Sequence, residues 1–399
     1  MTSAIAPRLH AAIVAGITAG RYLDRYYRDE FDRFARPLLV ALIQALIRRR
    51  LPEQPAAPAD ERELPDEAAA TRTIIATMAT FAQRTYAHSN SERIGNTKTY
   101  GVVHGEFEVL GDLPERMRHG VFSEARTYRA WVRFGGPGPL APPDPQDNGI
   151  LSVGIKLLDV PGPKLLDDES RTQDFTGISS PTFTTPDVVE NVKLQRRLLQ
   201  GLPAFYFIDP RDSHVLDAVM QGLYSRMNSS PLEVSYWSCV PYLLGEGQAM
   251  RYAIHPRTRR RTPIPKRPPP NYLRHAMAET LATERVEFDF SVQLQTDPQR
   301  MPIENASVIW SERRSRPVTV ARLRLPVQRF DTPEQHAFAR SLSFQPWHSL
   351  PEHRPLGNQN RARRAIYYEL SKLRQDMNGD PRIEPTGDER FPGSSGLPG

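Results

Sequence analysis

The stretch Val286–Leu294, VEFDFSVQL, alternates apolar and polar residues and is rich in β-branched and aromatic side chains. A period of two is typical of an antiparallel strand with one buried face. Similar runs elsewhere predict strands over residues 102–110, 129–134, 151–158, 234–240, 250–254, 306–310 and 318–325. Many strands joined by polar turns, with few helices between them, predict an antiparallel β-barrel rather than a doubly wound sheet.

Predicted helices flank these strands on both sides, so the fold class is α+β. An apolar helix begins at Pro37 and ends at the arginines 48–50, and further helices are predicted over 68–87, 333–341 and 359–375. A helix before Pro37 is indicated by apolar residues three to four positions apart, namely Leu23, Tyr26, Tyr27, Phe31 and Phe34. The chain therefore divides into an N-terminal helical extension and linker (1–67), a main domain (68–377) and a tail (378–399) whose composition predicts disorder.

Composition excludes several kinds of site. The 399 residues include 52 Lys and Arg, 46 Asp and Glu, and one cysteine. A single cysteine excludes a disulfide framework within the chain, a four-thiolate iron–sulfur cluster and a cysteine-based zinc site. A metal would need His, carboxylate or Tyr ligands, or Cys239, whose strand-like surroundings predict a small buried residue. The basic run 257–266, RTRRRTPIPK, is Pro-rich without interleaved aromatic residues, which indicates a solvated loop rather than a nucleic-acid surface.

The sequence also lacks the usual marks of export and of membrane insertion. The longest apolar stretches, 11–19 and 37–47, are about half the roughly 18–20 residues that span a bilayer. No clean small-residue cleavage site follows the first of them, so a signal peptide is not favoured. We expect an uncleaved, cytoplasmic protein.

The segment 361–374, RARRAIYYELSKLR, carries the strongest chemical signal. On a helix, Arg363, Tyr367, Leu370 and Arg374 share one face because they lie at i, i+4, i+7 and i+11. An arginine one turn before a tyrosine can donate a hydrogen bond to the phenol oxygen and so favour tyrosinate. Tyrosinate is a known axial ligand of ferric haem. The alternative interpretation is a packed aromatic residue between arginines that form salt bridges.

Together with other stretches, this helix resembles the catalase-related haem family over about residues 80–374. The matching stretches occur in the family's order, and they include Lys98 and Gly101. The others are SER (91–93), EFEV (106–109), WVRF (131–134), GIKLL (154–158), TQDF (172–175), PTF (181–183), YW (236–237), FDFSVQLQ (288–295), MPIE (301–304) and PWHSLPEHRPLG (346–357). The last stretch, followed by NRAR (360–363), resembles the smaller catalase-like proteins. The resemblance implies a catalase-like antiparallel β-barrel with flanking helices.

The resemblance also implies a cofactor, haem b, and residues that hold it. Tyr367 matches the axial tyrosinate that ligates the iron, and Arg363 matches the arginine that hydrogen-bonds it. Arg374, Arg93 and Arg133 match arginines on the side of the haem propionates. Three arginines facing two carboxylates suit bidentate anion recognition.

Four positions depart from the family's pattern around one expected pocket. Asn96 stands where the family has a histidine, and Ser179 stands where it has an asparagine. Gly135 replaces a residue that usually carries a hydroxyl group, and Leu151-Ser152 replaces an Arg-Gly pair. Cleaving hydrogen peroxide on haem requires a base that takes a proton from one oxygen and returns it to the other, and an amide has no usable pKa for this. Asn96 and Ser179 are left to orient a ligand at the sixth iron position.

Other histidines are weaker candidates for the missing base. His104 or His88 would reach the pocket only if the backbone path differed from that of the family. His348 and His353 are expected to be hydrogen-bonded structural residues.

Three hypotheses follow. The favoured one is a haem-dependent oxidoreductase acting on hydrogen peroxide or, preferably, an organic hydroperoxide or another specialised substrate, with reduced or absent catalase activity. The alternative is a non-catalytic haem-binding protein for storage, sensing or scavenging. A chain without haem is disfavoured because the arginines are retained. Expected partners are a small-molecule peroxide and no nucleic acid. The N-terminal helices either pack on the barrel or on another subunit of a homo-oligomer, or form an apolar lid or interfacial helix that guides a lipid-like substrate to the haem, with peripheral membrane contact.

Overall fold

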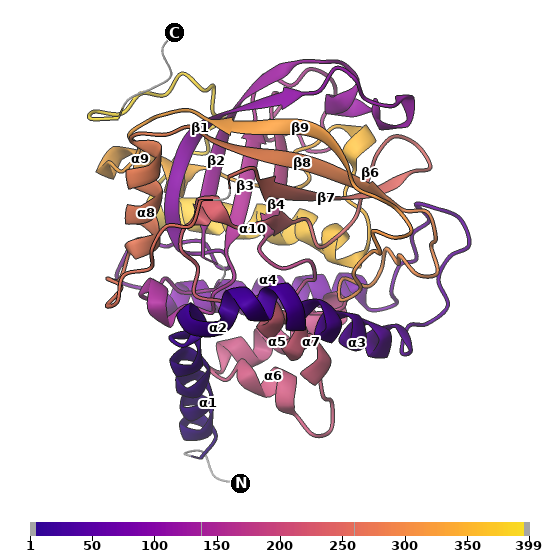
Figure 1. Ribbon diagram of the computed structural model, residues 1–399, viewed down its shortest axis with the longest axis vertical. Coiled ribbons are helices and arrows are strands. Elements are labelled where there is room, and N and C mark those ends of the chain that lie inside the picture. The colour runs from indigo at the N-terminus through magenta and orange to yellow at the C-terminus, as the bar shows by residue number, and fades with distance from the viewer. Residues whose placement is uncertain (1–4, 137, 259, 395–399) are drawn as a thin grey trace.

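The computed structural model describes residues 5–136, 138–258 and 260–394. Its strands form one antiparallel sheet in the order β5-β4-β3-β2-β1-β9-β8-β7-β6. Because β5 pairs with both β4 and β7, eight strands close into a barrel and β6 stays attached to β7 (Figure 1). The strands are β1 Thr99–Val109, β2 Thr127–Gly135, β3 Ser152–Leu157, β4 Gln173–Ile178, β5 Tyr236–Trp237, β6 Tyr242–Leu243, β7 Ala249–Pro256, β8 Val286–Leu294 and β9 Val318–Leu325.

In β8, the apolar residues of VEFDFSVQL are buried and the charged residues between them are partly exposed. Phe288, Phe290 and Val292 are fully buried, whereas the side chains of Glu287 and Asp289 remain partly exposed. The register between β8 and β9 shifts between Phe290 and Ser291, which marks a bulge. Inside the barrel, Phe290 lies 5.0 Å from Phe175 of β4 and 5.2 Å from Phe107 of β1, measured between ring centroids. The predicted antiparallel barrel is therefore confirmed, with an aromatic core.

Two of the predicted strands are wrong or too long. Residues 306–310 form no strand, because the backbone groups of residues 307–309 bond to side chains and those of Ala306 bond to the loop residues Phe183 and Pro186. Gln44 accepts a hydrogen bond from the Ile309 N–H (2.8 Å) and donates one to the Ser307 carbonyl (2.9 Å), while Arg251 donates to the Val308 carbonyl (2.6 Å). The strand predicted over 234–240 is only Tyr236–Trp237. Strands β4 and β6 were not predicted.

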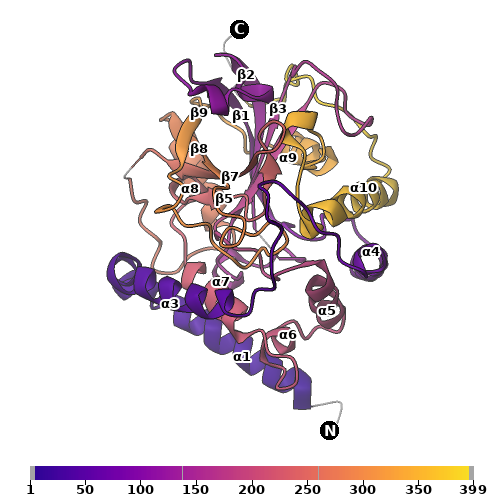
Figure 2. The same cartoon turned by 90° about the vertical axis from the view of Figure 1, so that its right-hand side faces the viewer.

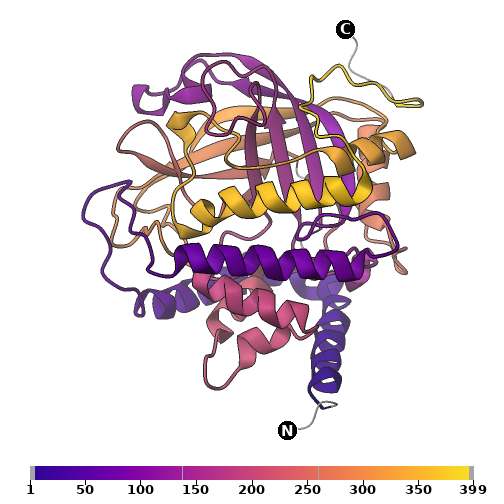
Figure 3. The ribbon, with the colours of Figure 1, turned by 180° about the vertical axis from the view of Figure 1, so that it is seen from behind.

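The described residues contain ten α-helices, all outside the barrel. Those predicted over 68–87, 333–341 and 359–375 are confirmed as α4, α9 and α10, whereas α5 to α8 were not predicted. The helices are α1 Ile5–Arg21, α2 Asp24–Glu30, α3 Arg36–Arg48, α4 Glu67–Thr85, α5 Val188–Leu199, α6 Ala204–Ile208, α7 Val215–Tyr224, α8 Tyr272–Leu281, α9 Pro333–Ser341 and α10 Asn358–Asn378. Helix α10 runs across the barrel, and α4 lies beside it (Figure 3). A hydrophobic cluster with Ile74, Val192 and Ile366 joins α4, α5 and α10.

The N-terminal helices lie at one end of the molecule, and α1 projects away from the barrel (Figures 1 and 2). A π-helical turn, Phe31–Ala35, joins α2 to α3. Most of the predicted amphipathic face points outward, because Leu23, Tyr26 and Phe34 are 57%, 79% and 59% exposed, whereas Phe31 packs on the cluster with Ile47 and Met220. Among the described helices, none combines the length and the apolar character that crossing a membrane would require.

Residues 379–394, within the tail for which composition predicts disorder, lie against the outside of the barrel. Glu389 accepts a hydrogen bond from the Trp131 indole (3.0 Å), and Asp388 forms an ion pair with Arg129 (2.7 Å). Phe391 packs against Trp131 and Phe338 in a second hydrophobic cluster. This segment therefore covers one outer face of β2.

Candidate functional site

Helix α10 is fixed at its N-terminus by buried and charged contacts. Gly357, just before the helix, has φ 85°, and a Cβ there would lie 2.6 Å from the Ile303 carbonyl oxygen, so only glycine fits. Glu304 accepts from the backbone N–H of Asn358 (2.7 Å). Arg361 forms ion pairs with Glu61, Glu67 and Glu304 at 2.6–3.0 Å. These contacts set where every later residue of α10 lies against the barrel.

Arg363 and Tyr367 are brought together on this helix. The Arg363 guanidinium lies over the Tyr367 ring, 4.7 Å from its centroid. Its two terminal nitrogens donate to Thr176 of β4 (2.7 Å) and to the Asn360 side chain (2.9 Å). Burial acts against the charge, but the phenol groups of Tyr367, Tyr242 and Tyr252 raise the pKa of Arg363 above its ordinary value. Arg363 thus stays charged between the barrel and Tyr367.

Tyr367 itself is half-buried beside apolar side chains. It packs against the cluster of α4, α5 and α10, together with the partly buried Met78, Val189 and Leu370. The neighbouring Tyr368 has a different partner, since Arg382 lies 4.4 Å from its ring centroid. Arg364, one turn before Tyr368, lies instead over Trp347 at 5.1 Å. Of the two adjacent tyrosines, only Tyr367 has an arginine of its own helix over its ring.

Arg93, Arg133 and Arg374 form a second group, here called the arginine group. Arg93 and Arg374 donate to the same carbonyl, that of Leu342 (3.1 Å from Arg374). Burial lowers the pKa of Arg133 to about 10, and the charge of Arg374 adds to this effect. Burial also lowers the pKa of Arg374 to about 10. The pKa of Arg93 is lowered by burial and by the charges of Arg133 and Arg374. The sequence predicts this grouping of residues 281 positions apart only through the family resemblance.

The arginine group has donors to spare. Within the described part of the chain, no carboxylate forms an ion pair with any of the three arginines. In this group, Nη1 of Arg93 and Nε of Arg374 are buried without a hydrogen-bond partner. Unpaired buried guanidinium groups are costly, and they suit an anion with several acceptor oxygens. These residues therefore fit a group that carries carboxylates, such as the propionates of haem.

The four departures from the family pattern meet at one end of the barrel. The register pairs Thr99 of β1 with Gly135 of β2, and Gly135 with Ser152 of β3. Ser152 in turn pairs with Ile178 of β4. Asn96 lies three residues before this row and Ser179 directly after it. Asn96, Gly135, Ser152 and Ser179 are called the strand-end group below.

Polar atoms of the strand-end group are used within the sheet. Ser179 accepts from the Leu151 N–H through its hydroxyl oxygen (2.8 Å), and Ser152 donates to the Gly135 carbonyl (3.1 Å). The Asn96 carbonyl accepts from Arg133 (2.6 Å), and Asn96 has φ 51°, a left-handed conformation that asparagine tolerates. Arg133 thereby links the strand-end group to the arginine group.

The histidines considered as substitutes lie elsewhere. His104 is on the outer face of β1, where its ring stacks on Trp131 with centroids 3.9 Å apart. Burial, with a contribution from Arg390, lowers the pKa of His104 to about 4. His88 is exposed in the turn after α4. Neither histidine adjoins the strand-end group.

His348 and His353 are hydrogen-bonded in the interior. His348 bridges Asp174 and Asp168, each at 3.0 Å, beside the fully buried Lys156. Burial and Lys156 act against protonation, but these hydrogen bonds and the charge of Glu169 raise the pKa of His348 to about 9. His353 accepts from the Val121 N–H (3.1 Å), and burial lowers its pKa to about 4.

Cys239 is 3% exposed, as predicted, and its thiol lies 3.0 Å from the Ser180 carbonyl. Burial raises the pKa of Cys239 to about 12, so the thiol is not a reactive group.

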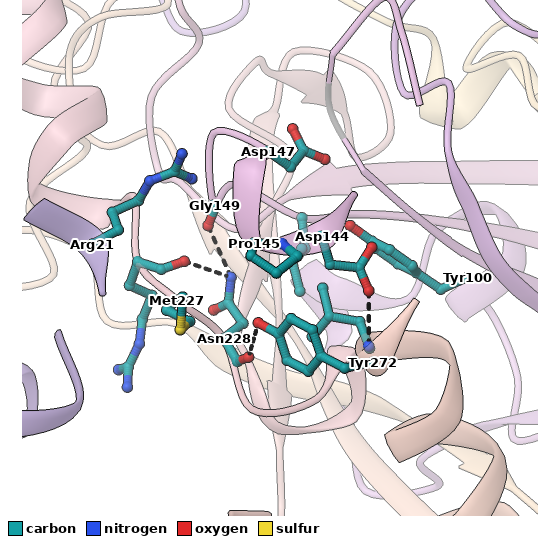
Figure 4. Close-up of a pocket in the computed structure, with 12 residues that line it drawn as sticks. Arg21, Tyr100, Asp144, Pro145, Asp147, Gly149, Met227, Asn228 and Tyr272 are labelled. Atoms are coloured by element: carbon teal, nitrogen blue, oxygen red, sulfur yellow. Dashed lines mark hydrogen bonds between the residues drawn. The ribbon is translucent and has the colours of Figure 1, made fainter. Parts of the chain in front are cut away.

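A small cavity lies beyond the strand-end group, between the end of α1 and the barrel (Figure 4). Its volume of about 10 Å³ is enough for a single water molecule. Arg21, Tyr100 and Asp147 contribute to its lining. Burial raises the pKa of Asp147 to about 6. This cavity is too small for a substrate.

Comparison with solved structures identifies the architecture. A fungal catalase matches with a TM-score of 0.56 and 14% identity over 83% of this chain and 68% of its own. A bacterial catalase matches with a TM-score of 0.54 and 15% identity over 86% of this chain and 68% of its own. Catalase A from Saccharomyces cerevisiae matches with a TM-score of 0.59 and 14% identity over 84% of this chain and 70% of its own. The fold is catalase-like. No protein-family model and no curated protein sequence matches the chain.

Several residues of the candidate site were not predicted. Thr176 and Tyr242 hold Arg363 from the barrel, and Tyr242 lies 3.4 Å from its Nη1. The network of Arg361 with Glu61 and Glu67 was also missed. The only sequence signal for this network is Glu304, which lies in the family-like MPIE stretch.

Proposed function

We propose that this chain is a haem-dependent oxidoreductase that acts on a peroxide. The single observation that carries the proposal is the arrangement on α10, where Arg363 lies over Tyr367 and Arg374 joins Arg93 and Arg133. Bound haem would supply a redox-active iron. Tyr367 would ligate that iron, and Arg363 would stabilise the phenolate by its charge. Arg93, Arg133 and Arg374 would hold the propionates.

Residues of the chain would then act on the substrate mainly by orientation. Asn96 would hydrogen-bond a ligand at the sixth position, and Ser179 would add a second contact through its hydroxyl. Neither side chain exchanges protons near neutral pH, so hydrogen peroxide would be dismutated slowly. We therefore propose an organic hydroperoxide or another specialised substrate in preference to hydrogen peroxide.

A second candidate function is haem binding without catalysis. It is favoured by the hydrogen bonds of Ser179 and Ser152, whose hydroxyl groups are engaged with the sheet backbone. In that case the arginine group and Tyr367 would serve storage, sensing or scavenging of haem. The two functions differ in turnover and not in spectrum.

The test combines a spectrum with two assays. The protein would be produced with haem supplied, and its visible spectrum, its oxygen release from hydrogen peroxide and its turnover of cumene hydroperoxide would be recorded. A Soret band of ferric tyrosinate haem with hydroperoxide turnover supports the enzyme. A Soret band with neither activity supports the second function, and the absence of haem rejects both.

A further inference from the structure

Exposed apolar side chains are concentrated in the N-terminal helices. Among the described residues, eighteen large apolar side chains are exposed, and twelve of them lie in residues 5–42, about a tenth of the chain. The most exposed are Tyr26 (79%), Leu38 (74%) and Phe34 (59%). Single exposed apolar residues are ordinary, but such a concentration indicates an interaction surface.

Helix α3 is apolar on opposite faces. Its inner face, with Val40, Ile43 and Ile47, packs on Met220, Leu223 and Val308. Its outer face continues from the preceding π-helical turn and consists of Phe34, Leu38, Ala41, Leu42 and Ala45, at helical spacing. A helix that is apolar all round is normally buried, so the outer face lacks a partner that it requires.

Helix α2 docks through polar side chains and leaves its aromatic residues outside. Asp24 accepts from the Met227 N–H (2.8 Å), and Arg28 donates to the Leu223 carbonyl (2.5 Å). Tyr22, Tyr26 and Tyr27 are therefore exposed. Tyrosine combines an apolar ring with a polar tip, which suits the boundary between a bilayer and water.

The charge of this region decides between possible occupants. Residues 5–50 contain nine arginines and four acidic residues, a net charge of +5 against +6 for the whole chain. All four acidic residues lie in the segment from Asp24 to Asp32. Helices α1 and α3 therefore contain arginines but no acidic residue. Two copies of this surface would bring arginines against arginines. An anionic surface complements them.

We propose that α1, α2 and α3 form a peripheral docking surface for an anionic lipid bilayer. The outer faces of α2 and α3 enter the headgroup boundary with Tyr26, Phe34, Leu38 and Leu42, while Arg33, Arg49 and Arg50 contact lipid phosphates and carboxylates. Helix α1 projects on the same side as the α2–α3 pair (Figures 1 and 3). Such helices lie on a membrane and do not cross it.

Vesicle co-sedimentation of the full chain tests the proposal. With vesicles of 70% phosphatidylcholine and 30% phosphatidylserine, most of the protein is expected in the pellet at low salt. With phosphatidylcholine alone, binding falls at least tenfold, because each arginine near an anionic surface contributes about a fivefold gain. Raising the salt concentration weakens binding to the anionic vesicles by screening.

Paired variants separate this surface from general hydrophobicity. Leu38→Glu with Leu42→Glu places two charges on the outer face of α3 without touching its packed face, and binding falls at least tenfold. Val327→Glu with Ile383→Glu, at residues 51% and 48% exposed elsewhere, leaves binding unchanged. Circular dichroism shows whether each variant is folded.

Light scattering supplies the opposing outcome. The lipid proposal is overturned if the wild-type chain does not bind anionic vesicles. It is also overturned, in favour of a second copy of the chain, if light scattering shows a stable dimer that Leu38→Glu with Leu42→Glu converts into a monomer. Since none of these measurements involves haem, the proposal stands or falls separately from the proposed function.

Discussion

The two sides of the candidate site treat their polar groups in opposite ways. On the α10 side, Arg93, Arg363 and Arg374 keep buried N–H groups without partners. At the strand ends, the hydroxyl groups of Ser152 and Ser179 are engaged by the backbone of neighbouring strands. One side therefore keeps free donors that can bind an anion, while the serine hydroxyl groups of the other side already have partners. The proposed haem binding and the proposed turnover can therefore be tested separately.

Loss of haem from the α10 side is the strongest effect that the proposed function predicts. Tyr367→Phe removes the proposed ligand oxygen while keeping the ring under Arg363, and we expect the Soret band to disappear or to move to that of loosely held haem. Tyr368→Phe is the matched control, because its ring contacts Arg382 instead (4.4 Å). If Tyr367→Phe leaves the spectrum unchanged and Tyr368→Phe alters it, the adjacent tyrosine is the ligand.

A gain of function at the strand ends gives the next largest effect. Asn96→His would supply the proton acceptor that the proposed site lacks, and a positioned acid–base group contributes about 10²–10⁴-fold. Oxygen release from hydrogen peroxide, measured with a Clark electrode, is expected to rise about 100-fold. Asn96→Gln is the control, since it changes size without adding a titratable group. Equal rates in the two variants would show that Asn96 does not adjoin the reacting position.

A substitution in the arginine group is expected to have two smaller effects, one on the stability of the haem-free protein and one on haem affinity. Arg374→Gln removes one of three mutually repelling buried charges, so thermal unfolding of the haem-free protein should occur at a higher temperature. If Arg374 holds a propionate as proposed, the same change also removes a charged hydrogen bond worth about 1.5–3 kcal/mol, so haem affinity should fall about tenfold or more. Haem transfer to apomyoglobin measures the second effect. A variant that is destabilised and binds haem normally would assign Arg374 to structure alone.

Sequence reasoning succeeded where the signal was local. The spacing within 361–374 places Arg363 and Tyr367 on one face because a helix has a fixed period. Strand β4 was missed because Gln173 and Asp174 are buried polar residues whose partners, such as Lys156 and His348, are distant in sequence. Periodicity showed that Leu23 and Tyr26 share a face but not that the face points outward. That orientation depends on Asp24 and Arg28, which bind backbone groups some 200 residues away.

The smallest expected effect concerns stability at the strand ends, where the pH dependence is set by Asp147. Burial raises the pKa of this carboxyl from 3.8 to about 6, so between these values the folded state holds a proton that the unfolded state has released. Stability contributed by the protonated group is present below about pH 4 and is lost as the pH rises through about 6.

Asp147→Asn keeps an acceptor for the Asn148 N–H and removes the charge. It should therefore stabilise the protein by about 1–2 kcal/mol at pH 7 and by little at pH 4. Urea unfolding at both pH values measures this, with Asp112→Asn at an exposed position as the control. A gain of equal size at both pH values would mean that Asp147 is not desolvated. The strand-end region would then be wetter than its packing indicates, and closer in character to a working catalytic pocket.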